Sequence, residues 1–314
     1  MNIGIDMMGG DFAPAEAVKG VRLFLSGSSA PATLFLFGDE KQVADLVKSE
    51  GIPAERITIV PTTQVIEMHE HPTRALKEKQ HSSISVGFQY LATGKIDAFI
   101  SAGNTGAMLV GTMYSIKAIE GVQRPTISTI IPKENGGTGL LLDVGLNADC
   151  KPELLNQFAV LGSLYAKHIL GIEDPKIGLV NIGEEEGKGN LLAQAAYPLL
   201  KANDQLNFAG NIEGRDVFMD KVDVMVCDGF TGNIILKLAE SLYEITQRKQ
   251  IEHPYFERFN FENYGGTPVL GVSKPVIIGH GISHAKAFYN MILLAQKMAE
   301  SRLMEMMKES FVQQ

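Results

Sequence analysis

The sequence Ile177-Gly-Leu-Val-Asn-Ile-Gly-Glu-Glu-Glu-Gly-Lys-Gly-Asn190 joins a short apolar run to an amphipathic stretch, Leu191 to Lys201. An apolar run bounded by turn residues predicts a buried strand, and the amphipathic stretch predicts a helix. The turn between them has three glycines, which cost backbone entropy, and three adjacent glutamates, which repel one another. Its functional interpretation is a site in which backbone amides and Lys188 hold an anionic group.

The same alternation of short apolar runs and longer amphipathic stretches continues along most of the chain. The predicted strands are Asn2 to Asp6, Ala32 to Phe37, Ile57 to Val60, Asp97 to Ser101, Ile177 to Ile182, Asp223 to Cys227 and Val276 to Ile278. The predicted helices are Gln42 to Glu50, Pro152 to Leu170, Leu191 to Lys201, Ile234 to Gln247 and Ala285 to about Met307. This pattern predicts an α/β three-layer sandwich, with helices on both faces of a mostly parallel sheet.

One pair of apolar runs breaks the repeat. Thr126 to Pro132 and Gly139 to Asp143 are joined through Asn135-Gly-Gly137, which is typical of a tight turn between antiparallel strands. The sheet is therefore predicted to be mixed. No repeat, linker or shift in composition marks a boundary, so a single α/β domain over residues 1–314 is expected. Two lobes around a cleft are the alternative.

Composition and charge exclude several classes of protein. The chain of 314 residues is 45% hydrophobic with a formal charge of −8. It has no basic cluster of the kind that nucleic-acid binding requires, so no nucleic-acid partner is expected. Only Cys150 and Cys227 are present, and the strand pattern begins at Asn2 without a signal peptide, so a reducing cytoplasm is predicted. No apolar run reaches the roughly 20 residues of a membrane span.

Five glycine-containing turns follow predicted strands. In open α/β sheets, ligands bind at the carboxyl ends of the strands, where helix N-termini present free N–H groups. Any one such turn is more often a simple helix cap, but five together favour a shared polar site. The five turns are Asp6 to Asp11, Ser101 to Gly106, Asn181 to Asn190, Cys227 to Asn233 and Gly279 to His284.

None of these turns matches a nucleotide-binding motif. No G-x-G-x-x-G follows the first strand, and the segment Gly183 to Gly189 is one residue too short for a Walker A loop. That segment also has no Ser or Thr directly after Lys188. A kinase or a dinucleotide-dependent dehydrogenase is therefore disfavoured.

Lys188 is the sharpest single candidate. A cation at a helix N-terminus can bind phosphate or stabilise a developing oxyanion. The alternative is an exposed lysine paired with Glu184 or Glu185. Because a positive charge opposes the helix dipole at that end, the functional interpretation is preferred. Asn104 and Asn233 each lie in a turn that opens a helix, where a side-chain amide can donate to an oxygen as well as cap.

The remaining reactive side chains fit simpler roles. Cys227 ends a strand, where a cysteine is more often a buried small hydrophobe than a nucleophile. The pair His69 and His71, with His81 nearby, lacks the cysteine or carboxylate cluster of a metal site, so no metal is predicted. His280 is a candidate acid or base, with helix capping as the alternative. No G-x-S-x-G motif supplies a nucleophilic serine. This inventory suits direct attack by a bound anion, such as phosphate, on an activated carbonyl.

At these residues the chain resembles the bacterial phosphate acyltransferases of the PlsX family, over nearly its whole length. The matching segments are Ile5 to Pro14, Ser101 to Ala107, Leu142 to Asn147 with Cys150 to Pro152, Asn181 to Asn190, Gly210 to Arg215, and Val226 to Asn233. The resemblance implies a fold similar to phosphotransacetylase and isopropylmalate dehydrogenase. It also implies transfer of an acyl group from acyl-[acyl carrier protein] to inorganic phosphate for phospholipid synthesis, without a cofactor. The expected setting is a cytoplasmic homodimer at the membrane surface, upstream of a glycerol-phosphate acyltransferase.

The resemblance assigns roles to particular positions. Lys188 is expected to bind phosphate or stabilise the oxyanion, and Asn233 to orient the substrate. The further expected substrate- and phosphate-binding residues are Asn104, Thr105, Gly106, Gly183, Gly187, Asp228, Gly229 and His280. The chain departs from the family pattern at Ser241 to Tyr264, which is shorter than the helical hairpin of relatives, and at His284, where relatives have other residues.

Two alternatives of other classes stay open from the sequence. The first is a metal- and NAD-dependent dehydrogenase of similar fold, which needs paired aspartates, whereas Asp143, Asp223 and Asp228 are scattered along the chain. The second is a non-catalytic regulatory protein at the membrane surface that uses the anion-binding turns to sense lipid headgroups or acyl phosphate.

Overall fold

The computed structural model describes residues 1–27 and 32–312. The fold is α/β as predicted, and its contacts divide the chain into two compact units. The first unit comprises Met1–Ala118 with Glu262–Met304, and the second comprises Ile119–Phe261 with Glu305–Gln314. The single domain over 1–314 stays a prediction, and residues 28–31 and 313–314 of it lie outside the described part.

The first unit is built on strands in the order β3-β2-β1-β4-β11-β10. Neighbouring strands are parallel from β3 to β11, and β10 is antiparallel to β11. The carboxyl ends of β1, β4 and β11 therefore meet at one edge. The bounds are β1 Asn2–Asp6, β2 Thr33–Gly38, β3 Ile57–Pro61, β4 Ala98–Ser101, β10 Thr267–Leu270 and β11 Val276–Ile278.

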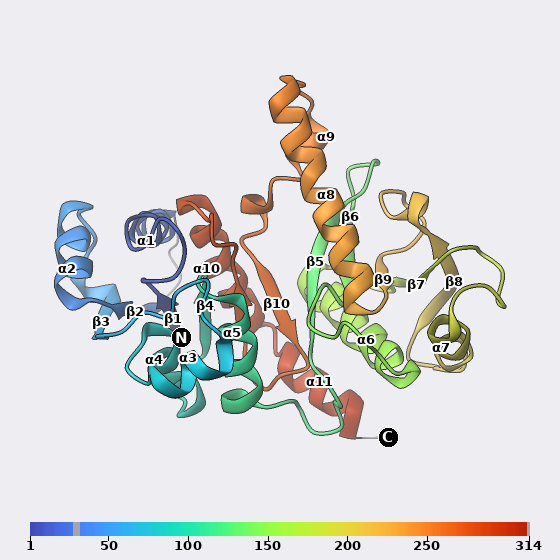
Figure 1. Ribbon diagram of the computed structural model, residues 1–314, viewed down its shortest axis with the longest axis horizontal. Coiled ribbons are helices and arrows are strands. Elements are labelled where there is room, and N and C mark those ends of the chain that lie inside the picture. The colour runs from blue at the N-terminus through green and yellow to red at the C-terminus, as the bar shows by residue number, and fades with distance from the viewer. Residues whose placement is uncertain (28–31, 313–314) are drawn as a thin grey trace. The chain divides into compact units, whose positions relative to one another are not determined.

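Helices cover both faces of these strands (Figure 1). Helices α1 and α10 pack against each other on one face, and α4 packs on β1, β2 and β4 from the other. The close approach of α1 to α10 requires Gly20, because a Cβ there would clash with Phe288. The helices that belong wholly to this unit are α1 Ala15–Gly27, α2 Glu40–Ser49, α3 Pro72–Glu78, α4 Ser83–Ala92, α5 Thr105–Gly111 and α10 Ala285–Glu300.

An aromatic cluster fills the core beneath α4. Phe99 of β4 meets Phe37 of β2 and Phe88 of α4 edge-to-face, with ring centroids 5.8 and 5.3 Å apart. All three rings are fully buried. Such edge-to-face pairs add to the large apolar area that each ring removes from water. The cluster fixes α4 on the strands and so fixes the edge at which β1 and β4 end.

The second unit has strands in the order β5-β6-β9-β7-β8. Strands β5 and β6 form the predicted antiparallel hairpin, and β6, β9, β7 and β8 run parallel. The mixed, mostly parallel arrangement is confirmed. The bounds are β5 Thr126–Pro132, β6 Thr138–Leu142, β7 Lys176–Asn181, β8 Asn207–Glu213 and β9 Val224–Val226.

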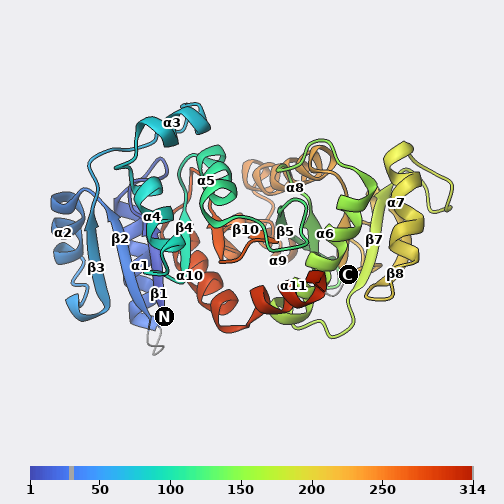
Figure 2. The same ribbon diagram turned by 90° about the horizontal axis from the view of Figure 1, so that it is seen from below.

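Helix α6 packs on α7 and on β6, β7 and β9, and α7 packs on β7 and β8 (Figure 2). Helix α8 runs beside β6 (Figure 1). After α8 the chain turns at Gln250 in a left-handed conformation, and α9 contacts the end of α8 (Figure 1). The bounds are α6 Pro152–Tyr165, α7 Leu191–Lys201, α8 Gly229–Lys249 and α9 Pro254–Glu257, with α11 Leu303–Val312 starting in the first unit. Among the described helices, none is long and apolar enough to span a bilayer.

Candidate active site

The loop between β7 and α7 is held by its own backbone and by neighbouring amides. Asn181 donates through Nδ2 to the Lys188 carbonyl at 3.1 Å, and its Oδ1 accepts from the Ile182 amide at 2.8 Å. Asn211 of β8 donates to the Glu185 carbonyl at 2.8 Å. These bonds fold Ile182–Asn190 back onto the end of β7, with Asn190 capping α7 through the Ala193 amide at 2.8 Å.

Glycine is required at one position of this loop. Gly189 has φ +98°, and a Cβ there would clash with the Asn181 side chain. Gly183 is buried. The side chain of Lys188 lies against it, since a Cβ added to Gly183 would be 3.1 Å from Lys188 Cγ. Gly187 has no atom within 4 Å of its Cβ position. Of the two glycines of this loop that were predicted to bind substrate or phosphate, Gly183 and Gly187, only Gly183 therefore lies against the side chain of Lys188.

Two of the three glutamates form ion pairs with other lysines. Glu184 Oε1 lies 2.6 Å from Lys221 Nζ, and Glu186 Oε2 lies 2.9 Å from Lys201 Nζ. The acidic run therefore connects the loop to the end of α7 and to the segment before β9. The sequence alternative, in which Lys188 is paired with Glu184 or Glu185, is not found.

Lys188 itself is exposed. Within residues 1–27 and 32–312, no ion pair joins it to another side chain. It stands two residues before the cap of α7, where the helix presents unbonded backbone N–H groups. The ammonium group is thus available to an anion from solvent.

The turn between β9 and α8 lies at the same edge, because β7 and β9 are adjacent and parallel. Asp228 caps α8: its carboxylate accepts from the Thr231 amide and hydroxyl, both at 2.9 Å. Gly229 donates to the Asn147 carbonyl at 2.7 Å, and a Cβ there would come within 2.8 Å of that oxygen. Asp228 and Gly229, both predicted to bind substrate, hold this turn together.

Asp143, at the end of β6, organises the segment beneath α8. Its buried carboxylate accepts from the Ile127 amide at 3.1 Å and from the side-chain amide of Asn147 at 2.9 Å. Burial raises the pKa of Asp143, although the hydrogen bonds from Ile127 and Asn147 oppose that shift. Burial likewise raises the pKa of Cys227 well above its ordinary value, which agrees with a buried small side chain rather than a nucleophile. The sequence did not predict that the Asp143 carboxylate accepts hydrogen bonds from Ile127 and Asn147. The four-residue spacing between Asp143 and Asn147 was the one signal for this contact.

Asn233 lies in the second turn of α8, with its side chain exposed. Its carboxamide faces Gly145, where a Cβ would lie 3.5 Å from Asn233 Cγ. Asp228, and not Asn233, caps the helix. The Asn233 amide is therefore not needed for capping and points from the helix surface at the edge where β6 and β9 end.

A pocket of about 430 Å³ lies between these two turns of the second unit. This volume is within the range of small-molecule sites, about 300–1,000 Å³. The lining residues come from α6, β7, the loop after it, α7 and the start of α8. They are Leu155, Leu179, Val180, Asn181, Ile182, Gly189, Asn190, Leu192, Ala193, Cys227, Asp228 and Thr231.

Three of the five predicted turns also meet in the first unit. The buried Asp6 carboxylate, at the end of β1, accepts from Ser101 Oγ at 2.6 Å and from the Met8 amide at 2.9 Å. The Gly103 amide donates to Ser101 Oγ at 2.9 Å, and the Asp11 amide donates to the Gly281 carbonyl at 2.7 Å. Burial raises the pKa of Asp6, although the hydrogen bonds from Ser101 and Met8 oppose that shift.

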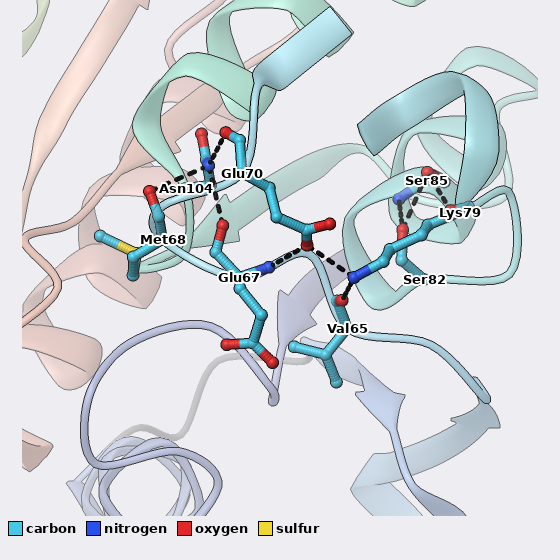
Figure 3. A network of polar contacts seen from close by, with 8 residues as sticks. All are labelled: Val65, Glu67, Met68, Glu70, Lys79, Ser82, Ser85 and Asn104. Carbon is cyan, nitrogen blue, oxygen red and sulfur yellow. Dashed lines mark hydrogen bonds and ion pairs between the residues drawn. The ribbon is translucent and has the colours of Figure 1, made fainter. Parts of the chain in front are cut away.

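Asn104 lies in the turn after β4 and is buried. Figure 3 shows the contacts of its side chain with the segment before α3. Its Oδ1 accepts from the Ala107 amide at 2.9 Å, which caps α5. Its Nδ2 donates to the carbonyls of Glu67, Met68 and Glu70 at 2.9, 3.2 and 3.0 Å. Both ends of the carboxamide are thus engaged within the protein, although the sequence predicted contact with substrate.

The other predicted residues of the first unit have different settings. Thr105 is exposed at the start of α5, and Gly106 packs against Pro72 so closely that a Cβ would clash. His280 follows β11, is half-buried, and accepts from the Ser283 amide at 3.0 Å through its carbonyl. His284 precedes α10 without a side-chain capping bond and stacks on Phe12, with ring centroids 4.4 Å apart.

The carboxylates that a metal would need are divided among separate bonds. Asp143 and Asp228 bind backbone amides as described, and Asp223 pairs with the buried Lys133 at 2.8 Å. Among the described residues, one cluster of three carboxylates is close enough to hold a metal ion. It consists of Glu184, Glu213 and Asp216, whose carboxylate oxygens lie within 4.8 Å of one another. Lys221 already pairs with Glu184 and Asp216, at 2.6 and 2.9 Å. The lysine supplies the positive charge that this acidic group needs.

Comparison with solved structures defines the fold class. A phosphotransacetylase from Streptococcus pyogenes aligns with a TM-score of 0.66 at 18% identity, covering 96% of this chain and 94% of its own. The EutD phosphotransacetylase from Staphylococcus aureus gives a TM-score of 0.62 at 16% identity, covering 95% and 94%. The predicted phosphotransacetylase fold is confirmed.

Comparison with sequences defines the family. A family model described as "Fatty acid synthesis protein" matches residues 1–306, and the chain belongs to that family. The Phosphate acyltransferase of Dictyoglomus thermophilum is 43% identical, over 96% of this chain and 94% of its own length. The Phosphate acyltransferase of Halothermothrix orenii is 40% identical, over 98% of both. The resemblance inferred from the sequence motifs is confirmed.

Proposed function

We propose that this chain is an acyltransferase that moves a fatty acyl group from acyl-[acyl carrier protein] to inorganic phosphate. Relatives at 40–43% identity, matched over nearly the full chain, bear the name Phosphate acyltransferase. The family model for fatty acid synthesis covers residues 1–306. These findings support acyl transfer to phosphate and do not favour the dehydrogenase or the purely regulatory alternative.

The observation that carries the proposal is that Lys188 is exposed and has no ion pair among the described residues. Two of the glutamates that precede it in the loop pair with other lysines: Glu184 with Lys221, and Glu186 with Lys201. Lys188 is left exposed beside the N-terminus of α7, a helix of 11 residues. A free ammonium next to unbonded backbone amides is an arrangement that binds a phosphate dianion.

The reaction needs no covalent enzyme intermediate. A phosphate oxygen attacks the thioester carbonyl carbon, a carbon–oxygen bond forms, and the carbon–sulfur bond breaks. The products are acyl phosphate and the carrier-protein thiolate, which takes up a proton. Negative charge develops on the carbonyl oxygen during attack, and a preorganised cation or amide donor lowers the barrier there. We assign phosphate binding or oxyanion stabilisation to Lys188 and substrate orientation to Asn233.

The other predicted contacts divide by their bonding. Asp228 and Gly229 shape the turn in front of α8, and Gly183 supports the stem of Lys188. Thr105 and His280, which belong to the first unit, stay predicted substrate-binding residues. Asn104 is proposed to act by positioning α5, because its donor and acceptor atoms are bonded internally.

The test is phosphate-dependent release of free carrier-protein thiol by the purified protein, measured with a thiol reagent. Release is expected only when both acyl-[acyl carrier protein] and phosphate are present, and acyl phosphate should accumulate in equal amount. Lack of release with carrier proteins of several acyl-chain lengths would refute the proposed function.

The wider setting is also proposed: a cytoplasmic homodimer that contacts the membrane surface and supplies acyl phosphate to a glycerol-phosphate acyltransferase. Support comes from the family resemblance and from one face of α8, where Phe230, Ile234 and Leu238 are 64%, 52% and 61% exposed. Their four-residue spacing makes one apolar stripe. Light scattering of wild type and Leu238→Glu tests the dimer, and flotation with anionic lipid vesicles tests the membrane contact.

A further inference from the structure

The pocket between the two turns of the second unit has apolar walls. Its inner surface is formed by Leu155 of α6, Leu179 of β7, Cys227, and Leu192 and Ala193 of α7. All of these residues except the half-buried Leu192 are buried. The deep end of the pocket therefore belongs to the apolar core of this unit, and only its rim reaches the polar loop.

The polar groups at the rim are already hydrogen-bonded inside the protein. Asn190 Oδ1 accepts from Ala193, and the Asp228 carboxylate accepts from both donors of Thr231. Asn181 uses its oxygen for the Ile182 amide and its nitrogen for the Lys188 carbonyl. A ligand rich in amides, such as the pantetheine arm of a carrier protein, would find few free partners here, whereas an aliphatic chain needs none.

The mouth of the pocket adjoins the loop that bears the candidate cation. Gly189 and Asn190 line the rim, and Lys188 directly precedes them. Ile182 also lines the pocket and is 80% exposed, so a large apolar side chain stands in solvent beside it. A chain that fills the pocket would therefore end in the neighbourhood of Lys188.

We propose that this pocket holds the acyl chain of the substrate, and that Ala193 sets the longest chain that it accepts. The inference rests on the proposed function, since it names the subsite that the acyl group occupies during transfer to phosphate. Ala193 is 8% exposed and lines the pocket in the first turn of α7. A larger side chain at this position would reduce the volume that is left for the acyl chain.

The first test measures thiol release with carrier proteins acylated by chains of 8 to 18 carbons. Ala193→Leu adds about three carbon atoms to the wall of the pocket and so removes room for about three methylene groups. In this variant, the longest chains that wild type accepts would leave about three methylene groups in water. Turnover of those chains, as kcat/KM, should fall by roughly 50-fold, while the shortest chains stay within about twofold. Ala195→Leu is the matched control, because Ala195 is on the same helix but exposed, and its profile should equal that of wild type.

A second variant protects the test against misfolding. If circular dichroism shows that Ala193→Leu does not fold, Leu192→Ala enlarges the pocket instead and should move the optimum toward longer chains. An equal loss of activity for all chain lengths in folded Ala193→Leu, or an unchanged profile, would overturn the proposal. An unchanged profile in Leu192→Ala would do the same.

The third measurement separates the pocket from the reaction. Binding of free fatty acids of 8 to 18 carbons is followed by isothermal titration calorimetry, without phosphate or carrier protein. The longest fatty acid that wild type binds should bind Ala195→Leu equally well and Ala193→Leu at least 10-fold more weakly. If binding behaves in this way but no thiol is released by wild type, the proposed reaction fails and the pocket assignment stands. If wild type binds none of these fatty acids, the pocket assignment fails whatever the turnover.

Discussion

The turns at the strand ends of the first unit and those of the second have the same composition, yet they differ in what their polar atoms do. In the first unit, Asp6, Ser101 and Asn104 are buried and bonded to one another or to backbone groups. In the second, the loop after β7 is bonded in the same way, but Lys188 remains exposed and unpaired among the described residues.

The difference shows how a cap can be told from a site. Glycine with asparagine, aspartate or serine closes a strand-to-helix turn in both units, so sequence composition cannot separate them. A group whose hydrogen-bonding capacity is spent inside the fold contributes to stability. A charged side chain that is exposed and forms no ion pair inside the fold is available to a ligand. The following predictions test this distinction.

Lys188→Ala should produce the largest effect on activity. Removing one oxyanion or phosphate donor typically lowers kcat by about 10²- to 10³-fold. Unfolding by urea should change by less than about 0.5 kcal/mol, because the side chain is exposed and unpaired. Thiol release and urea denaturation measure the two effects.

Lys176→Ala is the matched control for this variant, since Lys176 is exposed at the opposite end of β7. Its activity should stay within about twofold of wild type. Full turnover by Lys188→Ala would show that the exposed cation is not the site, and the comparison between the two units would lose its meaning.

Asn104→Ala should mainly lower stability. The change removes the cap of α5 and leaves three carbonyls of the segment before α3 without their donor. Loss of a cap together with buried hydrogen bonds costs about 2–3 kcal/mol of unfolding free energy. Thr105→Ala, at the exposed neighbour, should cost less than about 0.5 kcal/mol in the same urea titration. A stable Asn104→Ala protein with greatly reduced kcat would mean that Asn104 contacts substrate after all.

Gly189→Ala should loosen the loop that carries the cation. The φ of +98° and the clash with Asn181 make an added Cβ unfavourable by about 1–2 kcal/mol. Hydrogen exchange of residues 181–190 should become faster, and kcat should fall by roughly 10-fold because Lys188 is displaced. Gly187→Ala has open space around its Cβ position and should leave exchange of the loop unchanged. Equal exchange in the two variants would contradict the assigned conformation.

Glu16→Gln should have the smallest effect, and one that depends on pH. Partial burial raises the pKa of Glu16, but the bonds from Lys19 and the Ala285 amide outweigh this and lower it below the ordinary 4.5. A lowered pKa adds stability above pH 4.5, which is lost as pH falls through the lowered value. The wild-type advantage over Glu16→Gln should be about 0.5–1 kcal/mol at pH 7 and vanish toward pH 3 in thermal unfolding. An advantage that grows on acidification would be the wrong sign.

Much of the fold was predictable because the strong apolar runs are strands. The hairpin from Thr126 to Leu142 was predicted from its turn, and β1, β7 and β11 agree within one residue. Strands β8 and β10 were missed. In β8, Asn207–Glu213, polar residues and Gly210 interrupt the apolar pattern, and its pairing with β7 contains a register shift. Pairing with a neighbour, and not local composition, makes this segment a strand.

The candidate site was predictable in its loops but not in its bonding. Lys188 could be selected because a lysine beside three glutamates at a helix start is unusual. The partners of those glutamates, Lys201 and Lys221, are 15 and 37 residues away from Glu186 and Glu184, so only the folded chain shows them. The buried carboxylate of Asp143 was missed for the same reason, since its burial depends on α8 packing over the end of β6.

The loop after β7 is connected to the rest of the second unit by two ion pairs, Glu186 with Lys201 and Glu184 with Lys221, whose strength depends on ionic strength. Lys201 and Glu186 are both more than half exposed, and such pairs contribute less than about 1 kcal/mol each. At 0.15 M ionic strength the Debye length is about 8 Å, and it shortens to about 3 Å at 1 M. Concentrated salt therefore weakens the loop's connections at the same time as it competes for the free ammonium. At high ionic strength the loop should therefore be held mainly by the hydrogen bonds of Asn181, Asn190 and Asn211, which salt screens much less.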